Sequence, residues 1–164
     1  MSSVSPEIKL VSRFVRNLLD YDPNLIEFGR LNEEQENSSL NYIAIDSVLS
    51  SNPLAKGSSF NGDTEVQKRT RMFQKDFTIS FYGVDAYTNK DLFEMMIGDQ
   101  KSYDLQFELK VKVFPPKGSI DVKQLMGASY ANRIDVTVNV VYNKSIEVSV
   151  KRIDTLNHTL IINK

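Results

Sequence analysis

Apolar and polar residues alternate most regularly along residues 73–81, and this pattern predicts the central strand of a sheet. The apolar residues on one side are Phe73, Phe77, Ile79 and Phe81, and the polar residues on the other are Gln74, Asp76, Thr78 and Ser80. A period of two is typical of a half-buried strand. Residues 131–142 alternate as cleanly. The composition and spacing of four further segments also predict strands: residues 25–28, 40–49, 107–114 and 145–163.

Two segments show helical spacing instead. Residues 6–20 follow a possible cap at Ser5, have Pro6 in the first turn, and place apolar residues three and four apart. After a break at Gly83, Thr88 can cap a second helix at residues 89–97. A single helical turn is expected at residues 121–126.

Residues 50–68 are rich in serine, glycine and asparagine and contain the turn-forming sequence Asn61-Gly62-Asp63. They predict either a long hairpin that projects from the body or a disordered surface loop, and segments of this length are often functional. Together these elements predict the α+β class: a single domain, residues 1–164, in which two helices pack on a mainly antiparallel or mixed β-sheet. The length suits one domain and the chain contains no internal repeat.

Charge and composition narrow the function classes. The chain has 20 basic and 21 acidic residues and a formal net charge of −1, which argues against a dedicated nucleic-acid binder. It contains no cysteine, so thiol chemistry and zinc fingers are excluded. No apolar stretch has the length of a signal-peptide core or of a membrane span. We therefore expect a protein that is cytoplasmic where it is made and has no membrane partner.

Catalytic motifs are missing from the sequence. The single histidine, His158, has no partner for a Ser-His-Asp site, and the scattered glycines form no phosphate-binding loop. Residues 33–36 carry three glutamates, but their spacing fits no calcium loop and they read as solvated. Carboxylates such as Asp76, Asp85 and Asp135 remain for an enzyme to use. We predict no enzyme, no cofactor and no metal site.

Several local sequences occur in an order that resembles the neck and tail terminator proteins of tailed bacteriophages. These sequences lie at residues 42–45, 71–83, 109–111, 120–125 and 133–142. The resemblance spans about residues 8–155. Two parts of the chain depart from the usual pattern, namely the long glycine- and serine-containing insertion before Arg69 and the tail after Ile153.

The resemblance implies a structural virion protein without catalysis. Such a protein forms a ring, commonly a homohexamer, at the neck or at the top of the tail, where it joins or completes head and tail. Its partners would be other copies of itself, the tail tube and the neck or connector proteins. DNA would pass through the lumen without specific binding, and assembly would take place in the host cytoplasm.

On this reading, neighbouring subunits meet at the projecting segment. The residues expected at this interface are Lys68, Arg69, Arg71, Arg133, Asn61 and Asp63, because a guanidinium there can pair with a carboxylate across the boundary. The alternative is a monomeric module that binds a peptide or a sugar with its sheet or its long loop.

Overall fold

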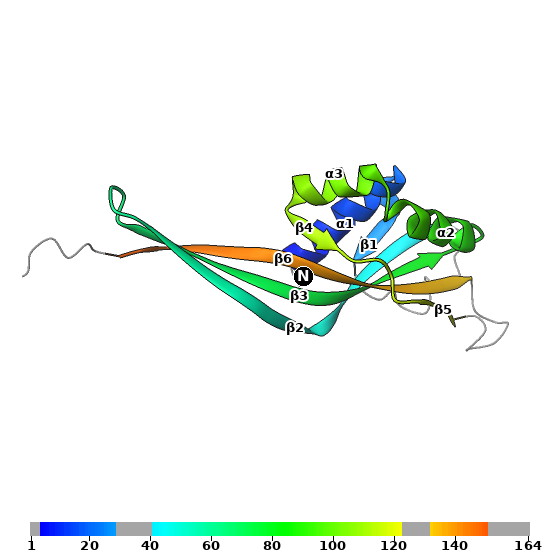
Figure 1. The fold of residues 1–164 in the computed structure, drawn as a ribbon. Coiled ribbons are helices and arrows are strands. Elements are labelled where there is room, and N and C mark those ends of the chain that lie inside the picture. Colours follow the sequence, from blue (N-terminus) through cyan, green and yellow to red (C-terminus); the bar gives the residue numbers. More distant parts are fainter. Residues whose placement is uncertain (1–3, 29–40, 123–131, 151–164) are drawn as a thin grey trace, which may run out of the picture.

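The computed structural model describes residues 4–28, 41–122 and 132–150, through which one six-stranded sheet runs (Figure 1). Its strands are β1 (Ile26–Phe28), β2 (Tyr42–Asn61), β3 (Val66–Tyr82), β4 (Val111–Val113), β5 (Ser119–Asp121) and β6 (Arg133–Ser149). The helices are α1 (Pro6–Leu19), α2 (Ala86–Met96) and α3 (Gln100–Leu109), and a short 3-10 helix, η1, spans Pro23–Leu25. The predicted α+β class is confirmed.

The strand order is β1-β2-β3-β6-β4, and β5 also pairs with β6. Strand β1 runs parallel to β2, and the other pairings among the described strands are antiparallel. In the centre of the sheet, Phe77 lies opposite Val138 and Ile79 opposite Val136. Paired residues point to the same face, so the separate apolar alternations merge into one apolar surface.

The helices all lie on that apolar face (Figure 1). Helix α1 follows Ser5, begins at Pro6 as predicted and contributes an apolar stripe at three- and four-residue spacing. It ends at Asp20, which adopts a left-handed conformation with φ 51°. The largest fully buried side chains come from α1, α2, β2 and β3: Phe14, Leu18, Ile43, Ile45, Phe77, Ile79, Phe81 and Phe93. Strand β6 adds the fully buried Val136, Val138 and Val140. Burial of these side chains is the main source of stability.

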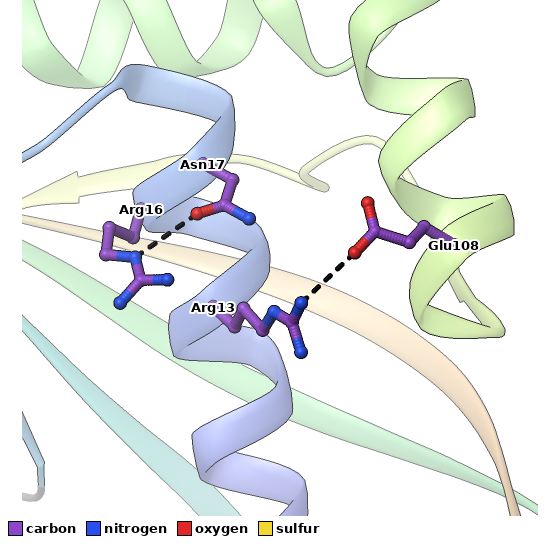
Figure 2. A network of polar contacts seen from close by, with 4 residues as sticks. All are labelled: Arg13, Arg16, Asn17 and Glu108. Atoms are coloured by element: carbon purple, nitrogen blue, oxygen red, sulfur yellow. Dashed lines mark hydrogen bonds and ion pairs between the residues drawn. The ribbon is translucent and has the colours of Figure 1, made fainter.

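Helices α1 and α3 lie side by side on the sheet. Figure 2 shows Arg13 of α1 pointing toward Glu108 of α3, with Nη2 and Oε1 3.1 Å apart, while Arg16 donates to the neighbouring Asn17. Both partners of the Arg13–Glu108 pair are more than half exposed, so this pair adds little to stability.

The predicted unit of strand, glycine and helix is present after β3. Gly83 has φ 98°, a conformation that glycine adopts without strain, and its N–H donates to the Asn132 carbonyl at 3.1 Å. Helix α2 begins earlier than predicted, at Ala86, with Asp85 rather than Thr88 at the N-cap position. The Ala86 N–H donates to the Gly83 carbonyl at 3.3 Å, so the turn at Gly83 leads directly into the helix, and Ala86 is fully buried.

The strand predicted at residues 107–114 is wrong over its first half. Residues Gln100–Leu109 form α3 and only Val111–Val113 form a strand. Lys110 separates the two elements with a left-handed φ of 54°, and its N–H closes the helix on the Gln106 and Phe107 carbonyls. The helical turn predicted at residues 121–126 lies mostly outside the described residues, and Asp121 itself ends β5.

The sheet face opposite the helices carries linked polar groups. Gln74 donates to Asn139 at 2.7 Å, and Asn139 donates to Asp76 at 2.5 Å. On the same face, Arg133 forms a two-pronged ion pair with Asp135, with both N–O distances 2.9 Å. The polar residues of the predicted alternation therefore lie on this face of the sheet, where they form hydrogen bonds with one another.

Candidate assembly surface

Three strands extend past the helices as a ribbon, which we call the arm (Figure 1). It consists of residues 51–61 of β2, 66–74 of β3 and 143–149 of β6. The hairpin predicted at residues 50–68 is thus confirmed, and β6 adds a third strand to it. At the tip, the Asp63 N–H donates to the Asn61 side chain at 3.0 Å, as is common in turns that follow asparagine.

One face of the arm concentrates positive charge. The pairing of the strands aligns Lys56, Arg71 and Lys144 in a row across the three strands, and the next row toward the tip contains Ser58, Arg69 and Ile146. Side chains in one row share a face, and these two rows share the face that the helices cover in the body. We call the four residues Lys56, Arg69, Arg71 and Lys144 the cationic cluster.

The cationic cluster lies beside aromatic rings. Arg71 lies over the Phe73 ring at 5.8 Å, and Lys144 lies over the Phe73 and Tyr142 rings at 5.6 and 5.7 Å. Such contacts hold the cations in place but leave their charge unneutralised. Within the described part of the chain, the ion pairs leave out Lys56, Arg69 and Arg71. Like charges on adjacent strands repel one another, so an acidic partner would relieve this repulsion.

Apolar side chains accompany the cluster. Ile146 is 61% exposed, and Leu54 and Phe60 of the arm are about half exposed. The cluster, Phe73 and Ile146 line an open groove of about 840 Å³. Exposed apolar residues within a charged rim are typical of protein-binding surfaces.

Among the described residues, the ion pair between Lys144 and Glu7 ties the cluster to the body. Lys144 Nζ lies 3.3 Å from Oε1 of Glu7, whose side chain is only 11% exposed at the start of α1. Burial alone raises the pKa of the Glu7 carboxyl, but its backbone hydrogen bond and the nearby Lys144 and Lys75 ammonium groups outweigh burial. The net result is a lowered pKa, so the charged form of Glu7 stabilises the fold.

We expect Glu7→Gln to lower the free energy of unfolding by about 1 kcal/mol at neutral pH, a small effect because Lys144 is half exposed. A lowered folded pKa contributes stability above the ordinary value of 4.5, and this stability is lost as the pH falls through the folded pKa. Urea unfolding of both proteins at several pH values measures this. The control Glu108→Gln removes a more exposed ion pair, drawn in Figure 2, and should change stability by less. A Glu7→Gln deficit that persists in acid would contradict the assignment.

The residues predicted at an interface lie at two places. Arg69 and Arg71 belong to the cationic cluster, Lys68 points from the opposite face of the arm beside Glu147, and Asn61 and Asp63 lie at the tip. Arg133 lies at the other end of β6, where Asp135 pairs with its guanidinium and the Tyr82 ring lies 5.3 Å away. The structure therefore groups five of the six residues on the arm and the turn at its tip, and it separates Arg133 from them.

Sequence reasoning missed Lys56 and Lys144. Lys56 was within the serine-rich insertion, and Lys144 lay between the strands predicted at residues 131–142 and 145–163, which the structure joins into the single strand β6 as far as Ser149. Only the pairing register of β2, β3 and β6 shows that these lysines belong to the cluster, because residues 56, 71 and 144 become neighbours when the three strands pair.

Other chemistry is sparse in the described ranges. No group of three or more histidine, cysteine, aspartate or glutamate side chains there can hold a metal ion. Asp76 accepts from Asn139, and Asp85 accepts from Asn41 at 2.6 Å, so the two carboxylates have structural partners. None of the described helices is long and apolar enough to cross a membrane.

Comparison with known proteins gives one family. The family model described as "Phage neck terminator protein" matches residues 8–164. No match is found among curated protein sequences.

Among solved structures, the chain is similar to the sheath/tube terminator of an extracellular contractile injection system, determined by cryo-EM in the extended state. The two share 12% sequence identity with a TM-score of 0.49, and the aligned region covers 96% of this chain and 64% of that one. This chain thus spans less than two thirds of the injection-system protein.

Proposed function

This chain belongs to the phage neck terminator protein family, and from that premise we propose that it closes the top of a phage tail as a homo-oligomeric ring. Membership indicates a structural role at the end of a tail, within the virion, and agrees with the resemblance seen in the sequence. The proposal adds that the ring, a hexamer, contacts the tail tube and the neck or connector proteins, joins head and tail, and assembles in the host cytoplasm.

The observation that carries the proposal is the arm. A stable monomer gains little from a ribbon of paired strands whose three segments 51–61, 66–74 and 143–149 stand clear of the core. Within the described ranges, no strand pairs with the outer edge of β2 past Ile45 or of β6 past Tyr142. Long open edges of this kind favour contact with another chain unless something blocks them.

The charge supports a channel that DNA crosses without being held. A net charge of −1 gives the chain no overall attraction for the phosphate backbone. The cationic cluster is then available for protein contacts, and a head-to-tail contact repeated by rotation closes a ring.

The test is negative-stain microscopy of the purified chain over a concentration series, with mass photometry to count subunits. We expect closed rings with a central hole wide enough for a DNA duplex, roughly 20 Å or more. Incubation with isolated tails that lack this protein should place the ring at the tail end. A chain that stays monomeric in both experiments would contradict the ring and favour a monomeric binding module.

A further inference from the structure

We propose that the cationic cluster of one subunit binds the outer face of α2 in the neighbouring subunit. The inference rests on the proposed self-assembly and names the two surfaces that meet. Both surfaces are built from described residues, and their charges are opposite.

Helix α2 and the residues that flank it are acidic. The helix itself carries Asp91 and Glu94 against one basic residue, Lys90, while Asp85 precedes it and Asp99 follows it at the N-cap of α3. Lys90 Nζ lies 2.7 Å from Asp91 and 2.9 Å from Glu94, so one cation serves two carboxylates. Their hydrogen bonds raise the pKa of Lys90, which therefore stays charged. The excess negative charge complements the cationic cluster, of which Lys56, Arg69 and Arg71 take part in none of the ion pairs within the described part of the chain.

The outer face of α2 also exposes apolar side chains. Phe93 and Ile97 point into the core, whereas Leu92 is 42% exposed and Met95 is 75% exposed on the opposite side of the helix. Val84, which precedes α2, is 73% exposed. Leu92 and Met95 can pack against Ile146 and Phe60 of the neighbouring arm, since the flexible methionine side chain fits irregular apolar surfaces. Apolar contact inside a charged rim is the usual arrangement of a specific interface.

The two surfaces lie at opposite ends of the molecule. The arm forms one end of the long sheet, and α2 covers the other end, next to the close of β3 at Tyr82 (Figure 1). The arm therefore cannot reach α2 of its own chain. A contact between unlike surfaces on opposite ends is heterologous, so each subunit uses both and the series continues until it closes.

Helix α3 offers a second exposed apolar residue but a poorer charge match. Phe107 is 87% exposed, and Asp104 and Glu108 lie beside it on the helix. Arg13 already pairs with Glu108, and Lys110 and Lys112 follow directly in the chain. The cations around Phe107 balance its carboxylates, so charge favours α2 as the receptor.

The first test reverses charge on each surface. We expect Arg69→Glu with Arg71→Glu to raise the concentration needed for assembly by about tenfold or more, and Asp91→Lys with Asp99→Lys to do the same. The fold should survive, because all four side chains are exposed. Circular dichroism and unfolding curves check this for each variant.

Mixing the two variants is the decisive step. The normal arm of the α2 variant can bind the normal α2 of the arm variant, and the two reversed surfaces are again opposite in charge. We expect an equimolar mixture to assemble at a concentration where neither variant assembles alone. Failure of the mixture, while the unmodified chain assembles, would overturn this contact and leave the ring intact.

A matched control separates the two faces of the arm. Lys68 and Arg69 are adjacent in β3 but point to opposite faces, so Lys68→Glu and Arg69→Glu change the charge equally. We expect Arg69→Glu to weaken assembly by several-fold and Lys68→Glu to leave it unchanged. An equal loss in both would contradict a contact confined to the face of the cationic cluster.

Disulfide trapping gives an independent readout, because the chain has no cysteine of its own. A chain carrying both Ser58→Cys and Met95→Cys should form a ladder of linked oligomers on non-reducing gels. Each single variant mixed with the other should stop at dimers. Rings without a ladder would overturn the arm–α2 contact. An unmodified chain that never assembles would overturn the proposed ring, and the contact with it.

Discussion

Phe77→Ala is expected to lower the free energy of unfolding by about 3–5 kcal/mol. Phe77 is fully buried in β3, opposite Val138 of β6 and Ser47 of β2. Removing its ring leaves a cavity at the point where the sheet meets the helices, and the paired strands on both sides limit how far the site can collapse. Urea unfolding of the variant measures the loss.

The control for this prediction is Phe107→Ala. It removes the same side chain from a position that is 87% exposed, so it should change stability by about 0.5 kcal/mol or less. A loss below about 1 kcal/mol in Phe77→Ala would mean that the apolar face of β3 does not form the core.

The regular elements that bury one face were predictable from the sequence. Alternation in β3 and β6 and the three- and four-residue spacing in α1 each report a boundary between core and solvent. The structure places Phe81 and Val136 at 0% exposure, as the alternation requires. These patterns can be recognised in a sequence because burial of one face requires an apolar residue at every second position of a strand and at every third or fourth position of a helix.

Helix α3 was missed because its inward positions are partly polar. Ser102 and Gln106 are buried, and Leu105 and Leu109 are packed against the core, so the helical spacing is present but half hidden. Phe107 then joined Leu109, Val111 and Val113 in an alternation that crosses the end of the helix by chance. Only the left-handed residue Lys110 separates the two elements, and a lysine gives no sequence signal for that conformation.

The arm could be predicted as a hairpin but not as a three-stranded surface. It stands clear of the core, so no buried face imposes an alternation on residues 51–61, and all of them are exposed. Their order comes from backbone pairing with β3, with register shifts between Ser47 and Ser51 and between Pro53 and Lys56. The cationic cluster depends on the register between β2 and β3, and this register cannot be predicted from a single sequence.

The candidate interface residues show the same limit. Arg69 and Arg71 were predicted because they follow the insertion, and the structure places them with two lysines from other strands. Arg133 was predicted because its guanidinium could pair with a carboxylate of a neighbouring subunit, yet it begins β6 and lies opposite Tyr82, at the other end of β3 from the arm. A contact between Arg133 and a neighbouring subunit stays a separate prediction. A carboxylate of that subunit would have to compete with Asp135 for the Arg133 guanidinium.

Gln106→Leu is expected to lower the free energy of unfolding by about 2–4 kcal/mol, although leucine is apolar and close in size. Gln106 is 5% exposed on α3. Its side-chain oxygen accepts from the Val113 N–H at 2.9 Å, and its amide nitrogen donates to the Ser102 hydroxyl at 3.0 Å. Leucine would leave the Val113 donor and the Ser102 hydroxyl buried without these bonds.

The large loss of stability expected for Gln106→Leu follows from the way β4 pairs with β6, which leaves the Val113 N–H without a partner among the described strands. Val113 pairs with Val140, while the adjacent Phe114 N–H donates to the Asn139 carbonyl at 2.9 Å, so the Val113 N–H points away from β6. Gln106 therefore satisfies a donor that a further strand would otherwise take. Gln100→Leu is the control, because Gln100 bonds Asp104 on the exposed side of the same helix and should cost about 0.5 kcal/mol or less. If both variants lost equally little stability, β4 would not depend on the Gln106 side chain. Faster amide exchange of the Val113 N–H in Gln106→Leu would instead establish that Gln106 protects the outer edge of β4.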